Sequence, residues 1–405
     1  MKPIVADERI QLLDIARGLA ILGILFVNIT FYSSSLQAIQ YQIELWPDFW
    51  NQAVKKFLDI VITGKFIAIF AFLFGYGMIL FKDRAGQKGR RFGALYSRRL
   101  LALLIFGLLH GWFIWFGDIL VHYALLGFVL LIFHKCKPKT LLIWAILLIM
   151  LIPVLMLISS GESAATPKIS PEFQQLIQQF IERDQAIYGS GSFAAIQQQR
   201  ILDWYASVMN QLIFYPQILG LFLMGAYFAK RKLFHDLSAN RPVLTKICLW
   251  TGGIGLTSIL LPILLELTAR TSAAGWIDKL NVFHYLLGSP SIGLFYITLL
   301  ALLVRKKAWE QALEPLANVG RMAFTNYIMQ SVLCTLIFYS YGLGWYGQVG
   351  PLTGSLIALI VFGLQLLFSA LWLRRFKMGP LEWIWRTVTY LSVSPNRKKK
   401  LTSTL

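Results

Sequence analysis

Long apolar runs alternate with short polar segments along nearly the whole 405-residue chain. A helix that crosses a bilayer needs about 20 predominantly apolar residues. The pattern therefore predicts an all-α polytopic membrane helix bundle with about ten transmembrane helices. We place the spans at residues 11–33, 64–82, 99–116, 118–134, 141–160, 208–229, 243–266, 283–304, 319–341 and 352–373.

Basic residues indicate the orientation of these spans. The loops on one side of the predicted membrane are rich in lysine and arginine, whereas the loops on the other side are longer and carry few. Cytoplasmic loops carry this excess, so both termini are predicted to be cytoplasmic, in a multi-pass protein of the inner (cytoplasmic) membrane. The basic segments are KDRAGQKGRR (82–91), KCKPK (135–139), KRK (230–232), RKK (305–307), RRFK (374–377) and RKKK (397–400).

Composition excludes several classes of protein. Hydrophobic residues make up 57% of the chain and charged residues 14%, which is too little polarity to cover a soluble domain of this length. The formal net charge is +19, but the basic residues flank the predicted spans and form no basic face with interleaved aromatics, which excludes nucleic-acid binding. Three isolated cysteines and the absence of HxxxH or HExxH spacing predict no disulfide framework and no metal site.

The chain is predicted to form one transmembrane helical domain over residues 1–394. Within it, residues 161–205 are expected to form a small extracytoplasmic helical cap of two helices, and residues 378–394 a cytoplasmic interfacial helix. Residues 395–405 are predicted to be a basic disordered tail that contacts anionic membrane lipids.

Ionisable side chains inside apolar runs are costly and therefore mark candidate sites. Arg17 and Asn28 are eleven residues apart in the first span, and Arg99, which follows Arg98, is eleven residues before His110 in the third. Eleven residues correspond to a rise of roughly 16 Å on one helix face, so each pair places a cation at the cytoplasmic mouth and a polar group near mid-bilayer. Arginine binds phosphate through a planar fork of donors, and a coenzyme A thioester has phosphates at one end and a reactive group at the other. Chance coincidence of the two spacings is the alternative.

Several polar residues also have a plain structural alternative. His110 could simply hydrogen-bond across helices. Asp118 follows Gly117 at the expected hairpin between two spans, where it could be solvated, cap the next helix or pair with His122. Arg321 lies at the cytoplasmic end of the ninth span, below further polar residues. This arrangement either repeats the pattern of a cation below a polar site, or the polar residues serve only to pack the helices together.

Glycine marks close helix contacts in the second and sixth spans. The stretches FLFGYGMIL (72–80) and LGLFLMGAYF (219–228) place small residues within apolar runs. Small residues let helix backbones approach closely in membranes. We therefore expect these two spans to approach their neighbours closely.

Six stretches, in order along nearly the entire chain, resemble the YeiB family of bacterial inner-membrane proteins, whose C-terminal half is a domain of unknown function. The stretches are RIQLLDIARGLAILGILFVNI, FAFLFGYG, RRLLALLIFGLLHGWFIWFGDILVHYALLG, LGLFLMGAYF, VGRMAFTNYIMQS and GPLEWIWR. The family is grouped with transmembrane acyltransferases related to heparan-α-glucosaminide N-acetyltransferase. The resemblance implies a bundle of ten or eleven helices that uses cytoplasmic acyl-CoA to modify an acceptor on the far side. The chain departs from these relatives where Asn28 and Ile39 stand at positions at which they have a histidine.

The resemblance implies a membrane acyltransferase that uses acetyl-CoA or another acyl-CoA as co-substrate to acylate a hydroxyl or amine of a glycan, lipid or small molecule. His110 would take a proton from the acceptor, and Asp118 would orient the histidine or the acceptor if a bend at Gly117 brought the two side chains together. Asn28 would hydrogen-bond the thioester carbonyl or the developing oxyanion. The arginines that would hold the CoA phosphates are Arg17, Arg98, Arg99 and Arg321.

Two other functions remain open from the sequence. The same buried polar groups could line the path of a transporter, although no inverted repeat of broken helices is evident. Alternatively, the chain could be a non-catalytic CoA-binding or lipid-binding membrane protein of the same fold, since it lacks the first-helix histidine. A homodimer is also left open.

Overall fold

The computed structural model describes residues 10–159, 170–268 and 274–398. In these ranges the chain is helical, with one isolated β-bridge between Phe376 and Arg397 and no strand. Eight segments of this part are long and apolar enough to cross a membrane. Their main helices are α1 (Gln11–Ser33), α4 (Lys65–Gln87), α5 (Phe92–Phe113), α7 (Pro138–Ser159), α10 (Tyr215–Lys230), α11 (Arg241–Thr268), α13 (Ser289–Leu303) and α17 (Pro351–Arg375).

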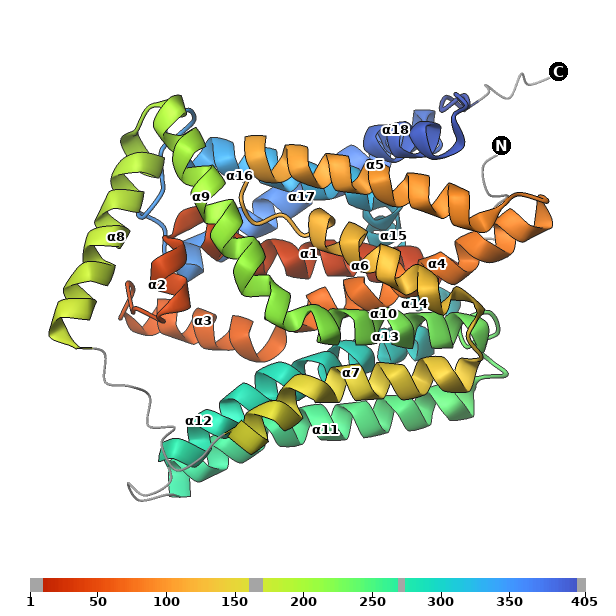
Figure 1. The fold of residues 1–405 in the computed structure, drawn as a ribbon, viewed down its shortest axis with the longest axis horizontal. Coiled ribbons are helices and arrows are strands. Elements are labelled where there is room, and N and C mark those ends of the chain that lie inside the picture. The colour runs from red at the N-terminus through yellow and green to blue at the C-terminus, as the bar shows by residue number, and fades with distance from the viewer. Residues whose placement is uncertain (1–9, 160–169, 269–273, 399–405) are drawn as a thin grey trace.

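Two predicted spans correspond to shorter apolar helices, α6 (Leu120–Ile132) and α16 (Ala323–Phe338). Each of the ten predicted spans thus falls on a helix of the described chain, which confirms the all-α polytopic bundle. The beginning of α1 and the end of α17 lie at the same end of the bundle (Figure 1), as expected for an even number of crossings. Following the distribution of basic residues, we call this the cytoplasmic end.

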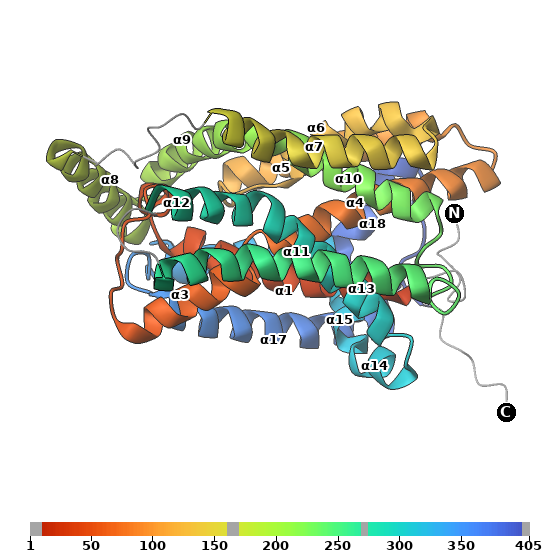
Figure 2. The ribbon, with the colours of Figure 1, turned by 90° about the horizontal axis from the view of Figure 1, so that it is seen from below.

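The remaining helices gather at the two ends of the bundle (Figure 1). At the extracytoplasmic end, α8 projects beyond the other helices (Figure 2), and α9 runs back from it along the bundle. The extracytoplasmic helices are α2 (Leu36–Gln40), α3 (Phe49–Val61), α8 (Pro171–Ser190), α9 (Phe193–Gln211) and α12 (Ala274–Phe283). The cytoplasmic helices are α14 (Lys307–Ala312), α15 (Glu314–Arg321) and α18 (Pro380–Tyr390). Part of the predicted 161–205 cap, residues 161–169, lies outside the described residues.

The beginning of the predicted tail is hydrogen-bonded to the end of α17. The Lys377 amide donates to the Asn396 carbonyl (2.9 Å), and the Lys398 amide donates to the Arg375 carbonyl (2.9 Å). These backbone bonds connect Asn396 and Lys398 to the end of α17. Residues 399–405 lie outside the described residues.

Glycines allow close contact between α4 and α10. A Cβ added to Gly75 would lie 1.8 Å from the Phe222 carbonyl oxygen, and one added to Gly225 would lie 1.9 Å from the Phe72 carbonyl oxygen. The backbones therefore touch at two points, and a methyl group at either position would force the helices apart. The predicted close approach of the second and sixth spans is confirmed.

Candidate functional site

The turn between α5 and α6 lies in the interior of the protein. α5 ends at Phe113, and the chain is non-helical over residues 114–119 until α6 begins. Irregular backbone at membrane depth requires partners for its N–H and C=O groups. Two side chains of α9 supply them, since Gln197 Nε2 donates to the Trp112 carbonyl (2.6 Å) and Arg200 Nη1 donates to the Phe113 carbonyl (2.7 Å). The helix α9 therefore covers the end of α5 and satisfies two carbonyls of its last turn.

Four buried polar side chains meet at this turn, and we call them the His110 cluster. His110 lies in the last turn of α5; its Nδ1 is 2.9 Å from Asp118 Oδ1, and its Nε2 is 2.8 Å from Ser331 Oγ on α16. The Tyr32 hydroxyl, on α1, is 2.7 Å from the same Ser331 Oγ. The exposed fractions of Tyr32, His110, Asp118 and Ser331 are 1%, 1%, 2% and 0%. Residues from α1, α5, α16 and the α5–α6 turn thus form one hydrogen-bonded chain shielded from solvent.

Hydrogen-bond chemistry sets the direction of this chain. Asp118 Oδ2 accepts from the Val121 amide (2.7 Å), and an ionised carboxylate can only accept. His110 Nδ1 must then carry the hydrogen that it donates to Asp118, and when the ring carries only this hydrogen, Nε2 accepts from the Ser331 hydroxyl. The Ser331 oxygen is free to accept in turn from the Tyr32 hydroxyl. A serine that donates to a histidine held by a carboxylate is arranged as an activated nucleophile.

Asp118 is more deeply buried than the sequence suggested. Of the alternatives left open for Asp118, solvation does not hold, because the chain reverses inside the protein and turns the carboxylate toward His110, while Asp118 Oδ2 accepts from the Val121 amide at the beginning of α6. Gly117 allows this reversal, since a Cβ there would lie 2.3 Å from the Trp115 ring. The contact between Asp118 and His110, expected only with a bend at Gly117, is therefore present.

Two other residues singled out in the sequence, His122 and Asn28, lie outside the His110 cluster. His122 does not pair with Asp118; its Nδ1 lies 2.7 Å from the hydroxyl of Tyr215 on α10. Asn28 is half-buried on α1, four residues before Tyr32, and so lies about one helical turn away on the same face. Within the described parts of the chain it is not a member of the hydrogen-bonded cluster.

The predicted phosphate-binding arginines lie at the cytoplasmic end, and Arg17 and Arg99 are among those that already have partners within the protein. Arg17 forms an ion pair with Asp14 (2.9 Å). The Arg99 guanidinium lies 3.6 Å from the centre of the Trp385 ring, on α18, and is close enough to Arg17 for their charges to repel. Stacking uses the face of a guanidinium and leaves its in-plane donors for other partners. Arg98 is half-exposed on a different side of α5, since neighbouring residues of a helix point about 100° apart.

The polar residues above Arg321 act in helix packing. Asn326 Nδ2 donates to Ser369 Oγ (2.9 Å), and Gln330 Nε2 donates to Gln365 Oε1 (2.9 Å). These bonds join α16 to α17, which is the plain alternative considered for this span. Arg321 ends α15, and its Nη2 donates to a backbone carbonyl just beyond α17 (3.4 Å).

Helix α18 fixes the beginning of α16. The Glu382 carboxylate accepts hydrogen bonds from the Phe324 amide (2.7 Å) and from the Thr325 amide (3.1 Å) and hydroxyl (2.6 Å). Burial raises the pKa of Glu382 above its ordinary value, against the bonds from Thr325 that favour the ionised form. The acid therefore caps the helix that carries Ser331.

A second buried polar group lies apart from the His110 cluster. Lys65 Nζ donates to the Asp59 carbonyl (2.6 Å) and lies 3.3 Å from Nε2 of His284. His284 Nδ1 is 2.8 Å from Ser258 Oγ on α11. This group contains a serine–histidine contact like that of the cluster, but no carboxylate side chain contacts its histidine within the described residues.

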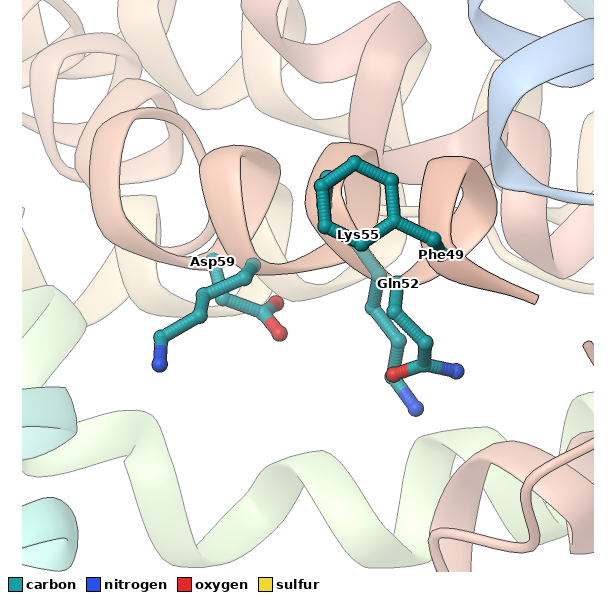
Figure 3. A pocket seen from close by; sticks show the side chains of 6 residues that line it. Phe49, Gln52, Lys55 and Asp59 are labelled. Carbon is teal, nitrogen blue, oxygen red and sulfur yellow. The ribbon is translucent and has the colours of Figure 1, made fainter. Parts of the chain in front are cut away.

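An open hollow lies at the extracytoplasmic end beside α3. Gln52, Lys55 and Asp59 extend from the same side of this helix (Figure 3). None of its lining residues belongs to the His110 cluster. The lining residues are Phe49, Gln52, Ala53, Lys55, Lys56 and Asp59. In the part of the chain that the structure describes, no group of three or more His, Cys, Asp or Glu side chains is placed to hold a metal ion.

Sequence reasoning did not identify Ser331, Tyr32 or Arg200 as site residues. A single serine in an apolar helix commonly bonds to its own backbone and gives no signal in the sequence. Tyr32 stands near a span end, where tyrosine is common. Arg200 could have been noticed as a lone arginine within the largely uncharged stretch AAIQQQRIL of the cap.

Comparison with known proteins places the whole chain in a family. Residues 228–392 match the family model described as "Protein of unknown function (DUF418)". The chain is 41% identical to the uncharacterized protein YxaH of Bacillus subtilis (strain 168), with 98% of both chains covered. It is 30% identical to an "uncharacterized 39.9 kDa protein in amylase 3'region" of Bacillus acidopullulyticus (99% of each chain) and 29% identical to the uncharacterized protein YeiB of Escherichia coli (strain K12), with 96% of this chain and 98% of YeiB covered. The chain therefore belongs to the YeiB family and is a multi-pass membrane protein of that family.

Proposed function

We propose that this protein is an acyltransferase of the inner (cytoplasmic) membrane. It would use acetyl-CoA or another acyl-CoA from the cytoplasm to acylate a hydroxyl or amine of a glycan, lipid or small molecule. The observation that carries the proposal is the buried hydrogen-bonded chain from Asp118 through His110 to Ser331.

The cluster supplies the groups that acyl transfer needs. Ser331 Oγ attacks the thioester carbonyl while His110 Nε2 takes its proton, and Asp118 stabilises the imidazolium that forms. The CoA sulfur leaves with the proton from His110. The acceptor hydroxyl or amine then gives a proton to His110 Nε2 and attacks the acyl carbonyl, and Ser331 Oγ leaves with that proton. The Tyr32 hydroxyl, 2.7 Å from Ser331 Oγ, holds the nucleophile in place by the hydrogen bond that it would donate in this arrangement. Asn28, one turn from Tyr32, is the proposed donor to the thioester oxygen.

The position of the cluster along α5 suits a long cofactor. Arg99 and His110 are eleven residues apart on this helix, a rise of roughly 16 Å. The arginines Arg17, Arg98 and Arg99 would hold the phosphates of CoA at the cytoplasmic end while the pantetheine arm extends toward His110. Arg321, at the same end, would add positive charge.

Covalent labelling tests the chemistry. Purified protein in lipid nanodiscs is incubated with radiolabelled acetyl-CoA, and label that survives denaturation is measured beside released CoA thiol. We expect label on the wild type, none on Ser331→Ala, and at most trace label on His110→Gln. Ser258→Ala is the matched control, because it removes a serine–histidine contact of the same length elsewhere in the membrane domain. Label that persists in Ser331→Ala, or disappears equally in Ser258→Ala, contradicts the assignment.

Calorimetry of CoA binding tests the cofactor separately. Arg98→Gln is preferable to a change at Arg99, because the Arg99 side chain also packs on Trp385 and its removal would loosen α18. We expect Arg98→Gln to weaken CoA binding about tenfold, which corresponds to one lost charge-assisted contact. Failure of a well-folded wild type to bind CoA would contradict the use of acyl-CoA.

A further inference from the structure

Arg200 on α9 is a fully buried arginine, and three of its five N–H donors have no partner among the described residues. Its side chain is 0% exposed, and Nη1 donates to the Phe113 carbonyl (2.7 Å) and to Gln197 Oε1 (2.8 Å). Its Nε and Nη2 are buried and have no hydrogen-bond partner among the described residues. Arginine stays protonated in proteins, so a positive charge with unsatisfied donors lies inside the molecule.

Arg200 has no carboxylate partner in the described chain. The nearest acid along α9, Asp203, is occupied, because its Oδ2 accepts from the Tyr188 hydroxyl (2.6 Å) and its Oδ1 accepts from Gln199 (2.9 Å). No ion pair within 4.0 Å joins Arg200 to any acid that the structure describes. An uncompensated buried charge is strongly unfavourable, so this guanidinium is expected to be paired with an anion that the chain does not provide.

Three further donors without partners lie near Arg200 or near the His110 cluster. Trp204 Nε1, Trp115 Nε1 and the Tyr339 hydroxyl are buried and unpartnered within the described ranges. The Tyr339 ring is 6.0 Å from the Arg200 guanidinium. The ring centres of Trp115 and His110 are 6.2 Å apart.

Trp204, also on α9, packs against the last turn of α5. Its Nε1 would lie 2.3 Å from a Cβ on Gly111, the residue after His110. Indole N–H groups can only donate, and the guanidinium can only donate. A group of donors with one fixed positive charge fits a ligand that is rich in acceptors and negatively charged.

We propose that Arg200, with Trp115, Trp204 and Tyr339, binds an oxyanion, the carboxylate or phosphate of an anionic molecule, beside the His110 cluster. That this anion belongs to the acyl acceptor rests on the proposed function, whereas anion binding itself does not. The acceptor class is then an anionic glycan, lipid or small molecule rather than a neutral one. Because Arg200 is enclosed, the anion enters when α9 separates from the α5–α6 turn, which breaks the bonds from Gln197 and Arg200 described above.

Thermal unfolding of the intact protein tests the site without acyl-CoA. The protein is placed in nanodiscs of phosphatidylcholine, and its melting temperature is measured against inorganic phosphate and against acetate at constant ionic strength. A third arm replaces part of the lipid with phosphatidylglycerol in the absence of either ion, which distinguishes a lipid headgroup from a free anion. We expect a saturable rise in at least one arm, with the concentration or lipid fraction for half effect increased about tenfold or more in Arg200→Gln.

Arg183→Gln is the matched control, because Arg183 is exposed on α8 and bonds only to Gln199 among the partners that the structure describes. It should keep the wild-type response. Arg200→Lys keeps the charge but loses the planar fork, so it should respond with weakened affinity and serves if Arg200→Gln does not fold. The proposal would be overturned if none of the three additions raised the melting temperature of the wild type, or if Arg200→Gln and Arg183→Gln responded equally. The unpartnered donors would then be expected to bind water. Because no acyl-CoA is present, a failed labelling or CoA-binding experiment leaves this result standing.

Discussion

Replacement of Asp118 by asparagine tests whether the His110 cluster is a directional proton relay. The wild-type carboxylate accepts from two donors, His110 Nδ1 (2.9 Å) and the Val121 amide (2.7 Å). An asparagine has one acceptor oxygen and one donor nitrogen, so it can satisfy only one of the two. If the oxygen faces Val121, the amide nitrogen faces His110 and forces the ring hydrogen onto Nε2. Ser331 then loses its proton acceptor.

The magnitude follows from the number of buried donors left without a partner. With the oxygen turned to His110 instead, the Val121 amide is unsatisfied, which costs about 1–3 kcal/mol. Asp118→Asn should therefore destabilise the protein by no more than about 3 kcal/mol. The loss is smaller if the ring hydrogen of His110 moves to Nε2, because both the Val121 amide and the asparagine amide nitrogen then have partners. Asp118→Ala leaves both donors unpaired and should cost about twice as much. In the serine-protease triad, the corresponding change to asparagine lowers kcat by about 10⁴, so we expect acetyl labelling of Asp118→Asn to fall by orders of magnitude.

Two measurements separate the effects on chemistry and on stability. A thiol-reactive dye that labels the buried Cys334 on unfolding reports the melting temperature, which should fall in the order wild type, Asp118→Asn, Asp118→Ala. Asp184→Asn is the control, because this buried acid accepts from the Ser35 hydroxyl (2.6 Å) and asparagine can do the same. Wild-type labelling rates in a folded Asp118→Asn protein would refute the relay.

Two further predictions concern the scaffold. Gly225→Ala places a methyl group 1.9 Å from the Phe72 carbonyl oxygen and should cost about 1–3 kcal/mol or more as α4 and α10 separate, whereas Gly77→Ala, whose Cβ would meet nothing within 4 Å, should melt like the wild type. Burial raises the pKa of Glu382 despite the bonds from Thr325, so the folded state binds this proton more tightly than the unfolded state. Stability should then decline as the pH rises from the unfolded value to the raised folded pKa, and a Glu382→Gln protein that kept the same decline in melting temperature would contradict this assignment.

The sequence predicted the spans because each is a long apolar run with a physical minimum length. The first span, placed at residues 11–33, coincides with α1, and the last, placed at 352–373, differs from α17 by two residues or fewer at each end. The third predicted span ends at residue 116, whereas the helix α5 ends at Phe113. The stretch WFIWFGDIL is apolar on both sides of the reversal, so hydropathy cannot show where a helix stops inside the protein.

The candidate site could be predicted only in part, because its partners are distant in sequence. His110 and Asp118 are eight residues apart and could be found together in one short stretch. Ser331 is 221 residues from His110, and Tyr32 is 299 residues from Ser331. Only the packing of α1, α5 and α16 brings these side chains together. The same packing shows Asn326 and Gln330, polar residues of the same span, to be helix contacts rather than site residues.

The short α5–α6 hairpin gives a physical reason for the location of the cluster. α6 has 13 residues, about 20 Å of helix, which is less than the roughly 30 Å hydrocarbon core of a bilayer. α6 alone is therefore too short to cross this core, and α9 covers the α5–α6 turn by hydrogen bonds from Gln197 and Arg200 to the last carbonyls of α5. In the proposed reaction, the acyl group arrives from the arginines at one end and the acceptor from Arg200 at the other. The reversal of the chain at the α5–α6 turn keeps His110 and Ser331 buried, so that in the proposed reaction the protein excludes water from the thioester.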